Sequence, residues 1–365
     1  MLPAKLRYDL FERLSVRTMR YVSAVPRRSA TGLVAEVYKM IEEDFFLNGS
    51  LTSRSKVPNL LAAIWSGGRE TVLVSDQLDR TTKEALTATL SSINDCPYCG
   101  DMMVSLVHAA DQHEDAAYIL NETEEQIADA LLRKRLLWVR SVATPGAVPM
   151  KTTPFTEAEL PEAIGSLMAL SDINRFSHIV MDGSPIQAPF GLQWIKTVAL
   201  RLFGGELRTT HILPLEPGRT LHMLPPAPLP RDMQWARPNP RIARTVAQWA
   251  AAVEKESMGV VSQNVKYLVN VNLSRWQGEI MPLSRSWVER EIGGLEGEER
   301  AIARFALVLA RASYQIDDKM VREVLGEGRD EARFLRILAW CSFTAARHFA
   351  RRIADQAVSQ LDQAA

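Results

Sequence analysis

Hydrophobic positions along this chain recur with the period of an α-helix. In residues 80–93, Leu86, Leu90 and Ile93 follow one another at intervals of four and three, and the methyl group of Thr89 completes the stripe. Such a stripe buries one face of a helix. Apolar runs of helical length predict further helices at residues 8–22, 33–46, 57–65, 126–142, 162–180, 192–203 and 241–256. We find no series of alternating strands, so the sequence predicts an all-α protein.

The start of one predicted helix carries a recognisable signal. Thr123 is followed three residues later by Gln126, which is the form of a capping box. In that motif each side chain bonds the backbone of the other residue and satisfies free N–H groups of the first turn. We therefore expect a helix to begin here.

A proline-rich stretch divides the helical pattern into two halves. Eight prolines fall between residues 204 and 240. Prolines at this density remove backbone donors and exclude the interior of a helix. We therefore expect a helical domain at 1–203, an extended surface connector at 204–240 and a second helical body at 241–365. A ligand segment for a proline-binding partner is the alternative interpretation of the stretch.

The second half repeats the helical pattern of the first. The same stripe recurs in residues 302–309, and a shift of 217 residues aligns the two segments by pairing Leu78 with Leu295. The same shift places Ser313 and Ile316 where the first half has two cysteines. We interpret the chain as a weak tandem repeat whose second copy lacks that thiol pair.

Composition excludes several classes of protein. The 43 Lys and Arg residues balance 43 Asp and Glu residues, whereas neutralising phosphates needs a basic excess or a basic stripe. No stretch approaches the roughly 18 uninterrupted apolar residues of a membrane span. Asp9 and Glu12 stand where a signal peptide would have its apolar core. We expect a cytoplasmic protein that binds neither nucleic acid nor membrane.

Candidate chemistry is concentrated in a Cys-x-x-Cys pair, Cys96 and Cys99. Asn94 or Asp95 is a natural N-cap and Pro97 suits a first helical turn. Both thiols should then lie at a helix start, where free N–H groups and the helix dipole favour a thiolate. Three interpretations compete: a zinc site, which lacks a second ligand pair; two buried structural thiols; and a redox-active dithiol. The placement and the spacing favour the redox-active pair.

Several segments around this pair match one family pattern. They are residues 80–84 (Arg-Thr-Thr-Lys-Glu), whose glutamate lies twelve residues before the Cys-Pro-Tyr-Cys motif, and the segments 60–65, 69–70 and 173–175. Together they resemble the alkylhydroperoxidase D-like, carboxymuconolactone decarboxylase-type proteins, over about residues 30–190. The resemblance implies an all-α helical bundle with thiol peroxidase activity, no cofactor or metal, and assembly into a homo-oligomer.

The resemblance also implies roles for individual residues. Cys99 would attack the hydroperoxide, Cys96 would resolve the sulfenic acid into a disulfide, and Glu84 would act in a proton relay. An external dithiol would then reduce the pair. Helix geometry instead favours Cys96 as the more acidic thiol, but we follow the resemblance because a glutamate relay can override a modest dipole preference. For Glu84, an exposed, salt-bridged surface residue is the alternative.

One position departs from the family pattern. The family has its relay histidine four residues after the second cysteine, where this chain has Met103. That position lies on the same helix face as Cys99, and a thioether cannot carry a proton. His108, nine residues after Cys99, should face the opposite side and is expected to be a packed core residue. Tyr98 is expected to pack the motif turn, with donation to a bound peroxide as the alternative role.

The sequence therefore favours an antioxidant thiol peroxidase that reduces hydroperoxides through Cys96 and Cys99. Two other functions remain open. One is a non-catalytic helical assembly protein or redox sensor that kept the fold, which Met103 and the thiol-free second copy favour. The other is a lactone decarboxylase-like enzyme, because fold alone does not fix function.

Overall fold

The computed structural model describes residues 13, 16–184, 193–211 and 213–362. These residues form helices and no strand, with one isolated bridge between Met19 and Met181. The prediction of an all-α protein is confirmed. None of the described helices is both long enough and apolar enough to cross a membrane.

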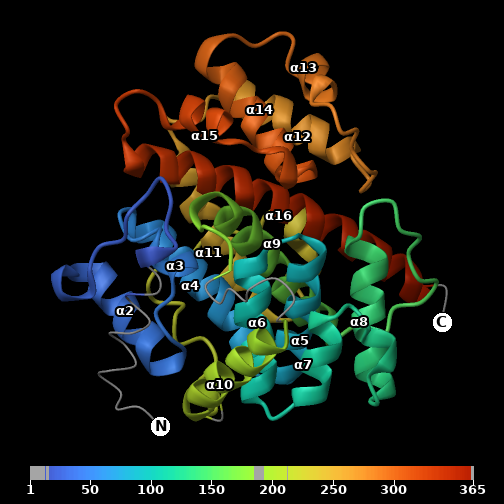
Figure 1. Cartoon of the computed structure of the whole chain (residues 1–365). Coiled ribbons are helices and arrows are strands. Elements are labelled where there is room, and N and C mark those ends of the chain that lie inside the picture. Colours follow the sequence, from blue (N-terminus) through green and yellow to red (C-terminus); the bar gives the residue numbers. More distant parts are fainter. Residues whose placement is uncertain (1–12, 14–15, 185–192, 212, 363–365) are drawn as a thin grey trace.

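The helices of the first half surround the Cys-x-x-Cys motif (Figure 1). They are α2 (Gly32–Asp44), α3 (Gly49–Thr52), α4 (Pro58–Gly68), the π-helical turn η2 (Arg69–Leu73), α5 (Arg80–Ile93), α6 (Pro97–Ala109), α7 (His113–Leu120), α8 (Ala130–Ala143), α9 (Leu160–Val180) and α10 (Gln193–His211). Short 3-10 turns are η1 (Arg27–Ser29) and η3 (Glu124–Gln126).

In the described residues of the second half, six more helices join this body. They are α11 (Pro240–Ser257), α12 (Gln263–Arg275), α13 (Ser286–Glu291), α14 (Gly297–Arg311), α15 (Asp318–Leu325) and α16 (Glu331–Asp362), with the 3-10 turns η4 (Arg231–Ala236) and η5 (Ser313–Gln315). At the shift of 217 residues, the first residue of α14 pairs with the first residue of α5, in agreement with the repeat.

Most helices expected from periodicity are present. The stripe at 80–93 forms α5 with the same bounds, and the runs at 33–46, 57–65, 162–180 and 241–256 form α2, α4, α9 and α11. The helix expected at 8–22 falls partly on residues outside the described part of the chain; of its described residues, 13, 16 and 17 are helical and 19–22 are not.

The capping box expected at Thr123 and Gln126 is wrong. These residues flank the short turn η3, and Thr123 makes no side-chain cap. The helix α8 begins instead behind Asp129, whose carboxylate accepts the backbone N–H groups of Leu131 and Leu132, both at 2.8 Å. The Asp129 carboxylate satisfies two free N–H groups of the first turn, so it favours a helix start more strongly than Thr123, which makes no side-chain cap.

The proline-rich segment is tied to both halves. The helix α10 continues to His211, past the boundary expected at 203, and irregular chain with turns at 217–222 leads from it to η4. Glu70 of η2 accepts the backbone N–H of Gly218, and Gln248 of α11 donates to the carbonyl of Leu224. The segment therefore lies along the helical body and is held there by hydrogen bonds to both halves.

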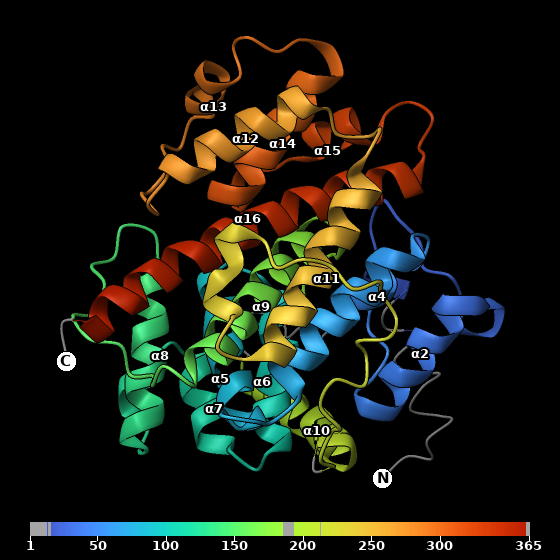
Figure 2. The same ribbon diagram turned by 180° about the vertical axis from the view of Figure 1, so that it is seen from behind.

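The two halves share one continuous hydrophobic core. The long helix α16 packs against α9 of the first half and α14 of the second, and it lies between the main body and the layer of α12 to α15 (Figures 1 and 2). The helices α4 and α11 meet closely at Gly67, where a Cβ atom would come within 2.5 Å of the Trp249 ring. This close approach requires glycine at position 67.

Candidate active site

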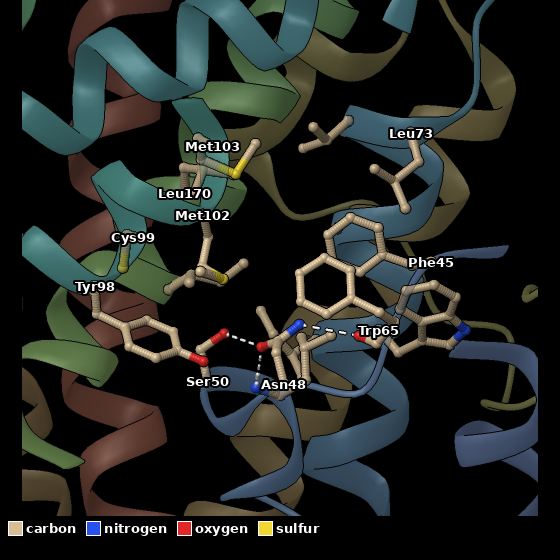
Figure 3. Close-up of a pocket in the computed structure, with 16 residues that line it drawn as sticks. Phe45, Asn48, Ser50, Trp65, Leu73, Tyr98, Cys99, Met102, Met103 and Leu170 are labelled. Carbon is tan, nitrogen blue, oxygen red and sulfur yellow. Dashed lines mark hydrogen bonds between the residues drawn. The ribbon is translucent and has the colours of Figure 1, made fainter. Parts of the chain in front are cut away.

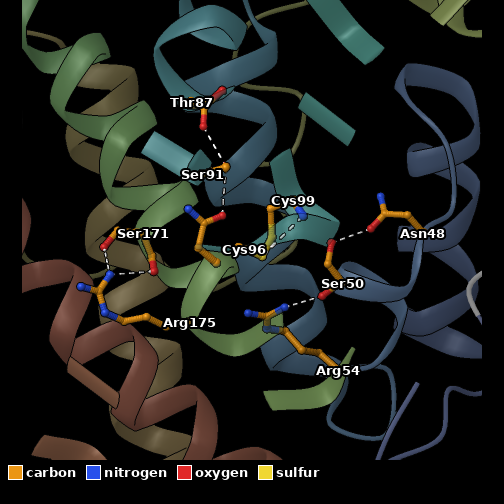
Figure 4. The surroundings of a disulfide bond; sticks show 10 residues. Asn48, Ser50, Arg54, Thr87, Ser91, Cys96, Cys99, Ser171 and Arg175 are labelled. Carbon is orange, nitrogen blue, oxygen red and sulfur yellow. Dashed lines mark hydrogen bonds between the residues drawn. A yellow bond between two sulfur atoms is a disulfide. The ribbon is translucent and has the colours of Figure 1, made fainter. Parts of the chain in front are cut away.

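The Cys-x-x-Cys pair lies at the start of α6, as the sequence predicts. Cys96 and Cys99 form a disulfide (Figure 4), with their Cα atoms 5.4 Å apart. The N-cap is Cys96 itself rather than Asn94 or Asp95, and Pro97 occupies the first helical position. The backbone N–H of Cys99 points at the Cys96 sulfur at 3.4 Å. Asp95 has a φ of 48° and makes the tight turn from α5 into the motif.

Hydrogen bonds hold this turn against α5 and α9. The carbonyl of Ser91 accepts the N–H of Cys96 at 3.1 Å, and the Ser91 hydroxyl lies 3.1 Å from the side-chain oxygen of Asn174. The next residue, Arg175, donates to the carbonyl of Ala310 in the second half. The segment 173–175, which carries part of the family resemblance, therefore lies beside the motif.

Cys99 lines a small apolar cavity of about 60 Å³ (Figure 3). Its walls come from α3, α4, η2, α6 and α9 and from the residues before α3. Apolar side chains make up most of the lining: Phe45, Phe46, Leu51, Ile64, Trp65, Val72, Leu73, Met102, Met103, Leu170 and Ile173. Figure 3 shows Cys99 and Tyr98 on one side and the rings of Phe45 and Trp65 across from them.

Three polar side chains also line this cavity. The Asn48 side-chain oxygen accepts the hydroxyl of Ser50 at 2.6 Å. The Tyr98 oxygen accepts the backbone N–H of Gly49 at 3.0 Å. Burial raises the pKa of Tyr98 to about 12, so its phenol stays protonated and keeps one O–H to donate.

Met103 shares the cavity with Cys99, as expected for residues one helical turn apart. Apart from Cys99, Tyr98 is the one titratable side chain among the described lining residues. The position of the family's histidine is therefore apolar in space as well as in sequence. No carboxylate or imidazole of the described lining can take a proton from Cys99.

Glu84 is fully buried, so the alternative of an exposed surface residue is wrong. Its carboxylate accepts Nε of Arg80 at 2.8 Å and lies 2.6 Å from Nε2 of His211 on α10. Burial raises the pKa of Glu84, but Arg80 and His211 outweigh it and hold that pKa below its ordinary value. The nine residues from Glu84 to the end of α5 span about 13 Å, and Glu84 is not among the described residues that line the cavity.

His211 is a partner that the sequence analysis missed. It lies 127 residues after Glu84, and nothing in the local pattern of either segment links the two. The structure brings them together because α10 packs against α6. At the closest point, a Cβ atom on Gly204 would lie 2.5 Å from the carbonyl oxygen of Ser105.

His108 points away from the cavity, as helix geometry predicts. It is buried, and its Nδ1 lies 3.1 Å from Nδ1 of His113. Burial and the neighbouring His113 and Arg201 lower its pKa to about 4, so the imidazole is neutral at pH 7. The structure does not bring His108 to Cys99.

The Cys96 side of the motif opens into a different space, which we call the Cys96 groove. It has a volume of about 280 Å³ and a mixed polar and apolar lining. Both halves contribute: Arg20, Tyr21, Asp95, Cys96, Pro97, Tyr98, Ser177, His178, Ile179, Met181, Gly183, Ile316, Asp317, Asp318 and Val321. Sequence analysis missed this groove because its walls come from four distant segments.

Metal-binding groups do not converge in the described part of the chain, where no three His, Cys, Asp or Glu side chains are placed to hold an ion. The third cysteine, Cys341, is buried in α16, and burial raises the pKa of its thiol.

Comparison with known proteins gives one relative along the whole chain. Over 350 residues the chain is 29% identical to an alkyl hydroperoxide reductase of Mycobacterium tuberculosis, and the match covers 95% of this chain and 98% of that protein. No family model matches the chain, and no solved structure matches it. The match extends through the second half, beyond the segments that carry the sequence motifs. The chain is therefore similar over nearly its whole length to an alkyl hydroperoxide reductase, in agreement with the alkylhydroperoxidase-like resemblance of its sequence motifs.

Proposed function

We propose that this protein is a thiol peroxidase that reduces organic hydroperoxides through Cys99 and Cys96. The observation that carries the proposal is the placement of Cys99 on an apolar cavity while its disulfide partner faces the Cys96 groove. The name of the mycobacterial relative agrees with this activity. An antioxidant role in the cytoplasm belongs to the same proposal.

The proposed reaction has two steps, one carried out by each cysteine of the motif. The Cys99 thiolate attacks the terminal oxygen of the hydroperoxide, the O–O bond breaks, and the alkoxide leaves as the alcohol after taking a proton. Tyr98, which lines the cavity with a protonated phenol, can donate a hydrogen bond to that leaving oxygen. The Cys96 thiolate then attacks the sulfur of the sulfenic acid, the S–O bond breaks, and the hydroxide leaves as water after taking a proton, which forms the disulfide.

The position of Cys96 suits this second step. A thiolate at the N-cap of α6 is stabilised by the helix dipole and by the N–H of Cys99, which lies 3.4 Å from the sulfur. The conflict between helix geometry and family resemblance then disappears, because the more acidic thiol serves as the resolving nucleophile.

The relay role of Glu84 stays a prediction. Its two hydrogen-bond partners are Arg80 and His211, and none of the three lines the cavity. The external dithiol and the homo-oligomer also stay predictions from the resemblance.

A redox sensor is the second candidate function, and one observation favours it. Since Met103 replaces the histidine, the described lining offers no base to deprotonate Cys99. A slow reaction with peroxide suits a sensor better than a scavenger. A lactone decarboxylase would also need a base other than a thiolate, and the cavity gives that alternative no support.

The deciding experiment measures how fast reduced protein loses its thiols. The protein is mixed with cumene hydroperoxide, tert-butyl hydroperoxide or hydrogen peroxide, with Cys96→Ser and Cys99→Ser variants alongside. Cys341→Ser serves as the matched control, because its thiol is buried away from both spaces.

The peroxidase proposal expects fast loss of two thiols per chain, abolished in Cys99→Ser. Cys96→Ser should lose one thiol and stop at the sulfenic acid, which a dimedone probe detects. Thiol loss no faster than that of a small free thiol would overturn the peroxidase and leave the sensor.

A further inference from the structure

The two sulfur atoms of the disulfide border different spaces. Cys99 lines the apolar cavity and is absent from the described lining of the groove, whereas Cys96 lines the groove and is absent from the cavity. A reagent that reaches Cys96 therefore approaches through a different space from the hydroperoxide. This separation indicates a second functional face.

Two adjacent polar residues of α9 line this face. Ser177 is 1% exposed, and its hydroxyl has no hydrogen-bond partner. A buried hydroxyl without a partner carries a desolvation cost that a ligand can relieve. The next residue, His178, is half-buried in the same groove.

Burial of His178 favours its neutral form. Burial lowers its pKa, Asp95 and a hydrogen bond to the Ser313 backbone raise it, and Arg20 lowers it; the net result lies below the ordinary value. Among the groove's other titratable groups, Tyr21 and Arg20 bond Asp318, Asp317 caps α15, and the Tyr98 oxygen accepts the N–H of Gly49. The Asp95 carboxylate is the acidic group whose charge acts on His178. The imidazole of His178 is therefore a free base at neutral pH.

The thiol-free second copy builds the opposite wall. Ser313 and Ile316 are the residues that the shift of 217 pairs with the two cysteines. Ile316 lines the groove, and the backbone of Ser313 holds His178. The segment of the second copy that lacks the two cysteines thus forms part of the groove beside Cys96.

We propose that the Cys96 groove is the reductant site, where a dithiol attacks the Cys96 sulfur and His178 accepts the proton of the incoming thiol. This inference rests on the proposed function, because it requires a disulfide that forms and opens in the working protein. The ligand class is a dithiol, presented by a small molecule or by a protein.

The exchange balances in two steps. The first thiol of the reductant gives its proton to His178 and attacks Cys96, the Cys96–Cys99 bond breaks, and Cys99 leaves as a thiolate. The second thiol of the reductant gives its proton to the Cys99 thiolate, directly or through solvent, and attacks the first sulfur of the reductant. The mixed disulfide then breaks, and Cys96 leaves as a thiolate that takes the proton back from His178. The reductant ends as a disulfide, and both cysteines are reduced with its two protons.

The test isolates the reductive half-reaction. The disulfide is prepared with diamide, and its reduction is followed by thiol appearance with dithiothreitol in one arm and thioredoxin in the other. The variants are His178→Gln and, as a milder change, Ser177→Ala. His222→Gln is the matched control, since His222 is 61% exposed and lies outside the groove.

We expect His178→Gln to slow reduction by dithiothreitol by at least about tenfold at pH 6.5, because a positioned general base usually contributes about 10²–10⁴-fold. The pH profile should also change. Without a base, the rate falls about tenfold per pH unit below the thiol pKa, because the thiolate is the nucleophile. Wild-type protein should fall less steeply until the pH passes below the pKa of His178.

Reduction by both reagents with the same dependence on His178 supports a protein dithiol, and reduction by dithiothreitol alone supports a small one. A wild-type rate and pH profile in His178→Gln, or equal losses in His222→Gln, overturns the proposal. Diamide forms the disulfide without peroxide, so the reduction rates can be measured even if the protein has no peroxidase activity. A lack of peroxidase activity would be detected separately, in the thiol-loss assay.

Discussion

The apolar cavity beside Cys99 can be filled from one position without disturbing the backbone. Gly68, the last residue of α4, lines the cavity and has right-handed helical angles, φ −63° and ψ −44°. A Cβ atom placed on it meets no atom within 4 Å. A larger side chain at position 68 therefore occupies cavity space rather than forcing neighbours apart.

The size of the effect follows from the volume. Gly68→Ala should stabilise α4 by about 0.5–1 kcal/mol, since glycine is a poor helix former. The leucine of Gly68→Leu adds three further carbons to a cavity of about 60 Å³. If these displace three carbons of the substrate, at about 0.8 kcal/mol each, the transition state loses about 2.4 kcal/mol, or about 60-fold in kcat/KM.

The assay compares peroxides of different bulk on Gly68→Ala and Gly68→Leu. We expect Gly68→Leu to lose about 60-fold with cumene hydroperoxide and less than twofold with hydrogen peroxide, which has no carbon to displace. Gly205→Leu is the control, because Gly205 is exposed on α10 and its added Cβ also meets open space. Equal losses for both peroxides, or none for cumene hydroperoxide, would refute the reasoning that this cavity holds the organic group.

Three further predictions follow from buried polar groups and from the missing histidine. Glu84→Gln removes the carboxylate charge that pairs with the buried Arg80 and should cost about 3 kcal/mol in urea unfolding at pH 7. Because the pKa of Glu84 is lowered, its contribution should be present above about pH 4.5 and fade as the pH falls through that lowered pKa, so a pH-independent loss would contradict it. Tyr98→Phe strands the N–H of Gly49 and should lower the free energy of unfolding by about 1–3 kcal/mol, with an unchanged urea midpoint as the contrary result. Met103→His places a base one turn from Cys99 and should speed thiol loss to hydroperoxide about tenfold or more at pH 8, whereas a rate equal to wild type would show that position 103 does not limit the reaction.

Local signals in the chain were enough for several of the helices and for the start of the motif. The stripe at 80–93 became α5 with the same bounds, and Pro97 marked the first turn of α6. The capping box at Thr123 failed because a better cap, Asp129, stood six residues further on. Such signals act over one or two helical turns, so they can be recognised in the sequence without knowledge of the tertiary structure.

Contacts between distant segments were beyond the sequence. Burial of Glu84 and its bond to His211 depend on how α10 packs on α6, and a single sequence holds no record of that pairing. The environment of a side chain decides its pKa through burial and neighbouring charges. The candidate role of Glu84 therefore could not be judged from its spacing to Cys96 alone.

The sequence by itself determined the all-α class, the redox-capable pair at a helix start and the absence of the family's histidine, because each depends on residue type and on spacing within a few turns. The tertiary structure decided which space each sulfur borders, since the walls come from segments up to about 300 residues apart in the chain. It alone joined His178 and Ile316 to Cys96. Helix packing determines these neighbours, and packing is a property of the whole folded chain.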